Sequence, residues 1–391
     1  MERVKATIIG AGAVGTAIAR ELSEEYPGEI FVVEKNQSPR GENQSSRNSG
    51  VVHAGVYYNR DTEPQRAKFC VEGNRLMYEF CDRYKVPCKA VGKLIVATNE
   101  EEDKTLDEYL QRAVNNGVPG VRKITGDEAK KMEPNVNACS ALHLPTSGIV
   151  DPVEFVDRLR GTAVGNGANF LYSTGVVDVA AKDDCFDIKV KTSDGQHYSF
   201  ESSILVNAAG LFSDEVAKMI NPENTFEINP LRGEAMKFYK TRRPTIGMAG
   251  MNVYPAPYFY TAADGTRRRT VGVHLTPTFD ENGEIGKTVT VGPGLVPKVG
   301  REDYSSSLPL NFFHDRVVKF FPDLQSDDLE LHQAGILAQL KGKSIQADFV
   351  IEPDKKYPNA IQLVGIDSPG LTSSLAIAKY VRTLIKELCI S

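Results

Sequence analysis

The sequence predicts an α/β protein built from two parts, a discontinuous dinucleotide-binding domain and a mainly antiparallel β-sheet domain of α+β type. Two observations carry this prediction. A Gly-x-Gly-x-x-Gly pattern at residues 10–15 lies between an apolar strand and a helix, almost at the start of the chain. A second glycine-rich turn, at residues 365–370, joins another strand to the last helix. Because both turns suit negative charge at a helix N-terminus, the two ends of the chain are expected to share one domain.

The first turn has the features of a Rossmann-like dinucleotide site. Gly10 allows the tight turn, Gly12 lets a pyrophosphate approach the backbone, and Gly15 lets the helix pack closely on the strand. A second strand, residues 29–33, ends in Glu34, where the pattern places an acid for the ribose hydroxyls. An acid at this point favours an unphosphorylated ribose, and therefore FAD or NAD over NADP.

Local signals place the elements between the two turns. Pro64 begins a helix, because a proline in the first turn loses no hydrogen bond, and Asp151 caps a helix that begins at Pro152. The continuously apolar run 203–210, which ends in a glycine, predicts a buried parallel strand. Further strands and helices are expected over residues 92–98, 100–115, 168–172, 175–180, 186–190, 196–200, 360–364 and 371–388.

The pattern changes between residues 226 and 331, where long strands follow one another with few helices. This pattern predicts an antiparallel sheet. We therefore assign residues 1–85, 146–225 and 332–391 to the dinucleotide-binding domain, and residues 86–145 and 226–331 to a substrate-binding domain. A chain of 391 residues is long enough for two such domains.

Composition argues against several classes of partner. A formal net charge of −5 gives no reason to expect a nucleic acid. No apolar run approaches the length that spans a bilayer, and the first strand begins too early for a signal peptide. A cytoplasmic protein is therefore expected, with peripheral contact to a membrane left open. The cysteines and histidines show no metal-ligand spacing, so no metal site is expected.

Together with the run Val206 to Gly210, the two glycine-rich turns make the chain resemble the FAD-dependent oxidoreductases of the D-amino-acid oxidase type. Several stretches are similar to the L-2-hydroxyglutarate dehydrogenases within that family: residues 45–58, 272–277, 291–293 with 301–304, and 367–374. The similarity extends over essentially the whole chain. It implies a Rossmann-like FAD-binding domain, a substrate domain, and FAD as the cofactor.

The resemblance also implies which residues bind FAD. They come from the first turn, the end of the second strand, the loop after it, a strand on the adenine side, and two later glycine turns. These residues are Gly10, Ala11, Gly12, Ala13, Val14, Gly15, Glu34, Lys35, Arg47, Asn48, Val177, Ala209, Gly210, Gly365, Pro369, Gly370, Leu371 and Thr372.

His53 is the candidate catalytic base, because imidazole titrates near neutrality and the resemblance places its segment beside the flavin. A structural or flavin-contacting role for His53, without proton transfer, stays open. The candidate substrate-binding residues are His274, Arg301 and Tyr58. His274 is equally explained as a buried histidine of the sheet.

One position departs from the family pattern. Leu337 stands where this superfamily usually carries an arginine that holds the substrate carboxylate. Leucine cannot make that bond. Either another cation supplies the charge, with Arg301, Arg232 and Lys341 as candidates, or the substrate differs from the usual one.

The resemblance therefore predicts FAD-dependent oxidation of a 2-hydroxy acid by hydride transfer to flavin N5, with L-2-hydroxyglutarate giving 2-oxoglutarate as the leading reaction. The electron acceptor is open among a quinone, oxygen and another flavoprotein. Two alternatives also stay open. One is a flavin oxidase or dehydrogenase of a small amine or amino acid, and the other is a non-catalytic flavin-binding protein, which Leu337 would favour. An NAD-dependent enzyme would leave the second glycine turn without an evident role.

Overall fold

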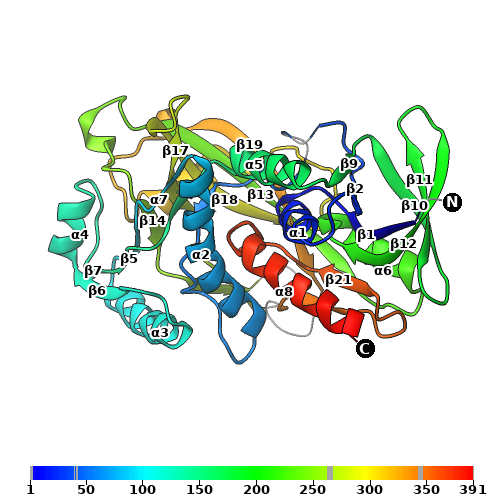
Figure 1. Cartoon of the computed structure of the whole chain (residues 1–391). Helices are drawn as coiled ribbons and strands as arrows, with labels where there is room; N and C mark the ends of the chain where they lie inside the picture. The colour runs from blue at the N-terminus through cyan, green and yellow to red at the C-terminus, as the bar shows by residue number, and fades with distance from the viewer. Residues whose placement is uncertain (1–2, 39, 41–42, 262–266, 342–346, 391) are drawn as a thin grey trace.

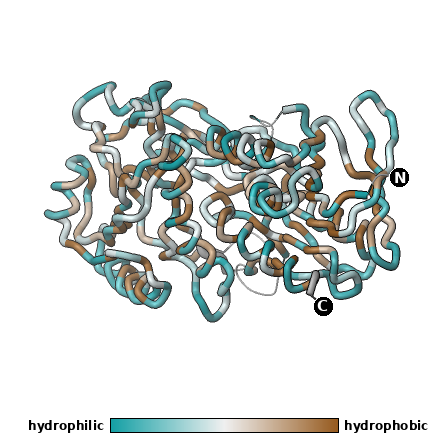
Figure 2. The backbone as a smooth tube through the Cα atoms, viewed as in Figure 1, coloured by the Kyte–Doolittle hydropathy of each residue, from teal (hydrophilic) through white to brown (hydrophobic). Residues whose placement is uncertain are grey.

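The computed structural model describes residues 3–38, 40, 43–261, 267–341 and 347–390. Figure 1 shows an elongated molecule, with β1, β12, α1 and α8 toward one end and α3, α4 and β5 to β7 at the other. Both chain ends lie on the side of β1 and α8. Hydrophobic residues follow the inner strands and helix faces, whereas the peripheral loops are mostly hydrophilic (Figure 2).

The first sheet brings the two ends of the chain together. Its main path runs β10-β11-β12-β1-β2-β9, and β21 also pairs with β12. The parallel strands are β1 (Arg3–Ile9), β2 (Ile30–Val33), β9 (Asn169–Leu171), β12 (His197–Asn207) and β21 (Ala360–Val364). The antiparallel additions are β10 (Thr174–Ala181), β11 (Phe186–Thr192) and β20 (Val350–Pro353). Segments from the beginning, middle and end of the chain thus share one sheet.

Helices cover this sheet according to the alternation of its side chains. Ile8 of β1 lies in the apolar cluster with α1 (Ala13–Ser23), α5 (Pro152–Gly165) and α8 (Gly370–Ile390). Its neighbour Ile9 lies in a separate cluster with α6 (Ser213–Ile220). The long helix α2 (Pro64–Tyr84) packs on α8. Each strand therefore contributes to two apolar layers, as expected for a buried parallel sheet.

The second sheet has the order β19-β13-β18-β17-β14-β5-β7-β6 and is antiparallel except where β14 meets β5. Its strands are β5 (Lys93–Ala97), β6 (Arg122–Thr125), β7 (Ser140–Leu144), β13 (Ile228–Tyr239), β14 (Asn252–Pro255), β17 (His274–Phe279), β18 (Ile285–Pro297) and β19 (Glu330–Leu340). Strands from both segments 86–145 and 226–331 lie in this sheet, and β19 extends it to residue 340, beyond the expected boundary at residue 331. The two sheets confirm the predicted fold class.

Alternation divides the second sheet into two faces with different chemistry. Leu94, Val253 and Leu275 lie in an apolar cluster with α7 (Leu310–Val317). The residues next to them in sequence, Lys93, Tyr254 and His274, belong to the opposite face because side chains alternate along a strand. The opposite face is also apolar around Ile95 and Leu142, which share a cluster with Tyr254. It differs from the first face in carrying Lys93 and His274 as well.

The remaining elements connect these layers. They are β3 (Val51–Val52), β4 (Cys88–Lys89) and β8 (Gly148–Val150) in a small sheet, the hairpin β15 (Tyr258–Thr261) and β16 (Arg267–Thr270), the helices α3 (Glu100–Asn116) and α4 (Gly126–Met132), and short 3-10 turns at Gly210–Phe212, Pro244–Ile246 and Ser326–Asp328. The predicted cap at Asp151 is confirmed, since its carboxylate accepts from the amides of Val153 and Glu154. Within the described residues, no helix is both long enough and apolar enough to cross a membrane.

A glycine lets α2 and α8 approach closely, and this contact can be tested. A Cβ at Gly73 would lie 2.2 Å from the carbonyl oxygen of Thr372. Since that neighbour is backbone, we expect Gly73→Ala to lower the free energy of unfolding by about 1–3 kcal/mol. At Gly161 of α5 nothing lies within 4 Å of the added Cβ. Gly161→Ala should therefore stabilise the protein by about 0.5–1 kcal/mol. Denaturant unfolding of both variants checks the pair, and equal stability would contradict the close packing.

Candidate cofactor and substrate site

A cavity of about 490 Å³ separates the first sheet from the face of the second that carries Lys93 and His274. Its lining comes from the β1–α1 turn, the end of β2, residues 43–53, residues 208–212, the inner residues of β13, β18 and β19, and residues 366–372. The cavity therefore lies at the carboxyl ends of the parallel strands β1, β2, β12 and β21, where open α/β sheets bind ligands.

Three glycines shape the end of the cavity at α1. Gly10 has a φ of +106°, and a Cβ there would lie 2.5 Å from the oxygen of Ala208. A Cβ at Gly15 would lie 2.0 Å from the oxygen of Gly10, so only glycine lets α1 pack on this turn. Gly12 is the N-cap and gives the helix no side-chain cap. The amide of Ala13 donates to Oγ of Ser45 at 2.8 Å. The next amides of the first turn and the positive dipole end of α1 suit a phosphate.

Glu34 is fixed at the end of β2 by backbone amides. Its Oε2 accepts from the amide of Ala11 at 2.8 Å, and its Oε1 accepts from the amide of Asn36 at 2.9 Å. Each carboxylate oxygen keeps a further lone pair for a ribose hydroxyl. The next residue, Lys35, also lines the cavity, and its Nζ lies 2.5 Å from Glu302 and 3.8 Å from the centre of the Phe212 ring.

A buried arginine fixes the second glycine turn. Arg66 of α2 is fully buried, and its guanidinium lies 2.5 Å from Asp367 and donates to the carbonyl of Ser368 at 2.5 Å. Burial raises the pKa of the Asp367 carboxyl, while the neighbouring Arg66 cation opposes this rise. The contact holds the loop that starts α8. The amide of Gly370, the first residue of α8, donates to the carbonyl of Asp367. Leu371 and Thr372 follow it in the first turn of α8 and line the cavity, and the first amides of a helix have no partner within the helix.

The segment after β2 supplies a donor without a partner. The Arg47 guanidinium lies 4.2 Å from the centre of the Tyr304 ring. Among the described residues, no hydrogen-bond partner lies near its buried Nε. Asn48 braces the same loop, since its amide donates to the carbonyl of Ser45 at 2.6 Å. The glycine cradle, the fixed acid, this orphaned donor and the helix N-terminus of α8 together fit an FAD molecule.

His53 lies where the cofactor cradle meets the rest of the cavity. Its backbone amide donates to Oγ1 of Thr372 at 3.1 Å, and its carbonyl accepts from Asn74 of α2 at 3.0 Å. Its Nε2 lies 3.5 Å from Oγ of Ser368, and within the described chain its buried Nδ1 has no partner. Burial, and then the charges of Lys93 and His274, hold the pKa of His53 well below 6.5. The imidazole is therefore neutral near pH 7 and able to accept a proton.

A second neutral histidine comes from the opposite wall. His274 of β17 lines the cavity, its ring stacks on Tyr254 with 3.7 Å between centres, and its Nδ1 lies 3.1 Å from the carbonyl oxygen of Gly272. Burial lowers the pKa of His274 to about 3. Tyr58 also lines the cavity, and burial raises the pKa of its hydroxyl. The structure thus brings His53, His274 and Tyr58 to one cavity.

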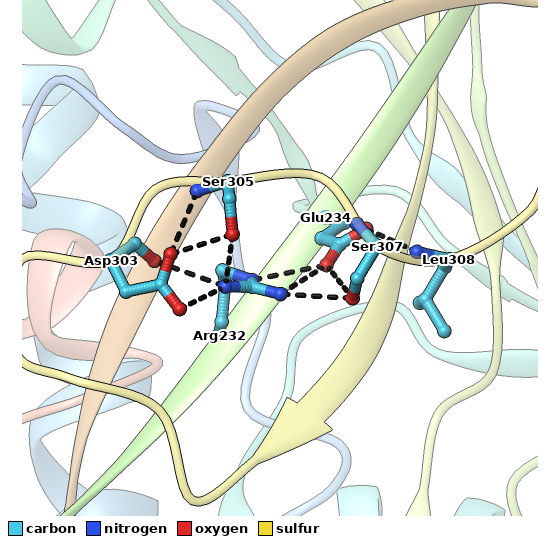
Figure 3. Close-up of polar contacts among 6 residues, drawn as sticks. All are labelled: Arg232, Glu234, Asp303, Ser305, Ser307 and Leu308. Carbon is cyan, nitrogen blue, oxygen red and sulfur yellow. Dashed lines mark hydrogen bonds and ion pairs between the residues drawn. The ribbon is translucent and has the colours of Figure 1, made fainter.

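Three cations considered for the substrate carboxylate are held elsewhere by acids. Arg301 pairs with Asp214 at 2.7 Å and also donates to the carbonyl of Leu211. Arg232 pairs with Glu234 and Asp303 and donates to two serines (Figure 3). Lys341 pairs with Glu227 at 2.8 Å. These three cations lie outside the cavity lining.

Leu337 does line the cavity, opposite Leu231 of the paired strand. This part of the wall is therefore apolar where the family pattern has a guanidinium.

Of the residues predicted to bind FAD, Ala11, Gly15, Gly365 and Val177 lie outside the lining. The first three support the two turns, as their contacts with Glu34, Gly10 and Leu340 indicate. Val177 is 42% exposed on β10. All the other predicted FAD-binding residues line the cavity.

Sequence reasoning missed Arg66 and Tyr254. Arg66 could have been noticed as a charged residue beside the apolar face of α2, whereas nothing local distinguishes Tyr254 from a core aromatic. In the described residues, no group of three or more His, Cys, Asp or Glu side chains could hold a metal ion.

Comparison with known proteins identifies relatives of this chain. The family model described as FAD dependent oxidoreductase, DAO, matches residues 5–384. The mitochondrial L-2-hydroxyglutarate dehydrogenase of Arabidopsis thaliana is 34% identical, over 97% of this chain and 83% of its own. A glycerol 3-phosphate dehydrogenase of Caloramator mitchellensis is 31% identical, over 97% of this chain and 73% of its own. The dithionite-reduced L-alpha-glycerophosphate oxidase of Mycoplasma pneumoniae, solved with FAD bound, has a TM-score of 0.83 and 25% identity, covering 99% of this chain and 95% of its own.

The buried ion pair beside the second turn predicts a large effect on stability. Arg66→Met leaves Asp367 buried without its cation, so we expect the free energy of unfolding to fall by about 3–5 kcal/mol. The double variant Arg66→Met with Asp367→Asn removes that isolated acid and should recover part of the loss. Arg75→Met on the same helix is the control, since Arg75 is 61% exposed and pairs only at the surface. Denaturant unfolding measures all three, and a double variant no more stable than Arg66→Met would contradict the assignment.

Proposed function

The chain belongs to the DAO family of FAD-dependent oxidoreductases, and from that premise we propose that it oxidises a 2-hydroxy acid, with L-2-hydroxyglutarate giving 2-oxoglutarate as the leading reaction. The observation that carries the proposal is the neutral imidazole of His53, which lies beside the N-terminus of α8 and whose buried Nδ1 has no hydrogen-bond partner among the described residues. A hydroxyl oxidation needs a base for the O–H proton next to an acceptor for the Cα hydride. The cavity places His53 beside the residues that would hold the flavin.

Residues of this chain hold the cofactor at three points. The first turn of α1 would bind the pyrophosphate, Glu34 the ribose, and the first turn of α8 would face negative charge at the other end of the cavity. When bound, the flavin ring of FAD accepts the hydride that leaves the substrate carbon. His53 takes the hydroxyl proton, so the substrate loses two electrons and two hydrogens and becomes the keto acid. Residues of the second sheet form the opposite wall of the cavity.

The names of the relatives support an alcohol as substrate. They name L-2-hydroxyglutarate at 34% identity and glycerol 3-phosphate at 31% identity. Both molecules are secondary alcohols that carry an anionic group. The second name makes L-glycerol 3-phosphate the second candidate substrate for this chain. Oxidation of a small amine on the same fold is the remaining catalytic alternative, and it needs the same hydride transfer.

The test is the visible spectrum of the purified protein before and after anaerobic addition of each candidate. We expect flavin bands that bleach with L-2-hydroxyglutarate and not with its D isomer. Bleaching by L-glycerol 3-phosphate alone would move the assignment to the second candidate, and bleaching by glycine would favour the amine oxidases. Flavin that no candidate bleaches would support a non-catalytic protein.

His53→Ala should slow anaerobic flavin reduction by about 10²–10⁴-fold while the flavin spectrum is retained, because the variant removes the base. His197→Asn is the matched control, since His197 is exposed on β12 far from the cavity lining. Stopped-flow absorbance measures both rates. A reduction rate for His53→Ala equal to that of the control would contradict the role of His53.

The rate of flavin reduction at saturating substrate should also stay constant down to about pH 6.5. The pKa of His53 lies well below 6.5, so its neutral, proton-accepting form dominates above that pH and is lost only at more acid pH. A pH series of the limiting reduction rate measures this. A rate that already falls between about pH 8 and about pH 7 would contradict a neutral base in the resting protein.

A further inference from the structure

Lys93 is a buried cation that the proposed mechanism does not use. It begins β5 and is 1% exposed. Among the described residues, no carboxylate forms an ion pair with it, in contrast to Arg232, Arg301 and Lys341. Burying an ammonium group without a neighbouring acid costs desolvation free energy, so packing alone does not explain why Lys93 is buried here.

The register of the second sheet places Lys93 next to the substrate side of the cavity. β5 pairs with β14 and β14 pairs with β17, which puts Lys93, Tyr254 and His274 on three successive strands. The Nζ of Lys93 lies 3.8 Å from the centre of the Tyr254 ring, and the His274 ring stacks on the same tyrosine. Tyr254 and His274 both line the cavity. The ammonium is therefore one aromatic ring away from the cavity.

We infer that Lys93 is a positioning residue whose charge, acting across Tyr254, draws the anionic group of the substrate into the cavity where Leu337 offers none. This inference rests on the proposed function, because it assigns the charge that an anionic hydroxy acid needs. Lys93 does not touch the substrate in this scheme. It acts through the field that a buried, unpaired charge produces in a medium of low dielectric constant.

The surrounding groups agree with this role. Burial lowers the pKa of Lys93 to about 7. The groups that face it from neighbouring elements are Tyr57 of the segment after β3, Cys70 of α2, Tyr254 of β14, and the two histidines His53 and His274. Burial raises the pKa values of Cys70 and Tyr254 and lowers those of both histidines. Among Lys93 and these four neighbours, the pKa of Lys93 is the one that lies near 7.

The affinity of the cavity for an anion should fall as the pH rises. Lys93 carries its charge below about pH 7 and loses it as the pH rises. A bound anion stabilises the charged form, so binding at higher pH must take up a proton. Affinity for an anion should therefore be greatest below about pH 7 and should weaken by about tenfold between about pH 6.5 and about pH 8.5.

Glutarate tests the inference without turnover, because it carries the carboxylates of the substrate but has no hydroxyl to oxidise. Its binding to the flavin-loaded protein is followed by the change in flavin absorbance. Lys93→Met keeps the length and removes the charge, and we expect about tenfold or more weaker glutarate binding at about pH 6.5 and no pH dependence. Lys89→Met is the control, since Lys89 is 49% exposed and pairs with Glu284 at the surface. Equal affinity of Lys93→Met and the control would overturn the inference.

Two further readouts separate this role from a structural one and from the reaction itself. With substrate, Lys93→Met should raise KM while the limiting rate of flavin reduction changes less. A misfolded site would instead raise KM and also lower the limiting rate strongly. If Lys93→Met fails to hold flavin, proton uptake by the wild-type protein on binding glutarate at about pH 8 decides, and no uptake would overturn the inference. If L-2-hydroxyglutarate fails to bleach the flavin but glutarate binding still depends on Lys93, the proposed function fails and the anion-attracting role of Lys93 stands.

Discussion

The buried contact between Arg66 and the turn before α8 joins parts of the chain that lie about 300 residues apart. The guanidinium comes from α2, and the groups it binds, Asp367 and the Ser368 carbonyl, set where α8 begins. The first turn of α8 then positions His53, whose amide donates to Thr372. The candidate base, the helix N-terminus and the floor of the cavity therefore share one support. Both charges of this ion pair are needed, because burying either one without the other is strongly destabilising.

The second sheet serves the site through the simplest property of a strand, the alternation of its side chains. Leu94, Val253 and Leu275 fill an apolar cluster, so the strand positions are fixed by packing. The intervening positions are then free to carry Lys93, Tyr254 and His274 toward the cavity. A one-residue shift of register would exchange these two sets. The apolar cluster therefore determines where the polar groups lie, although it contacts no ligand.

The parts of the site that the sequence predicts are those whose physical requirement is local. Gly10 and Gly15 are needed because a Cβ would strike backbone within the same turn or the neighbouring strand, and such needs appear as a short pattern. Arg301 shows the opposite case. Its charge suggested a carboxylate clamp, but its partner Asp214 lies 87 residues away and nothing in the sequence pairs the two. Lys93 escaped notice for the same reason, since the burial of a single charge depends on tertiary contacts. For Arg66 the sequence offered only the weak signal of a charge beside the apolar face of α2.

The distribution of charge around the cavity bears on which substrates it admits. Arg232 and Arg301 are paired with acids, so they contribute little positive electrostatic potential in the cavity. Within the part of the chain that the structure describes, no acid pairs with Lys93, and below about pH 7 it places positive charge behind Tyr254. A protonated amine entering the cavity would meet repulsion, whereas an alcohol with a carboxylate or phosphate would be attracted. Both histidines are neutral and do not offset this preference. The electrostatics thus favour an anionic alcohol over an amine on a fold that, by its backbone alone, could serve either.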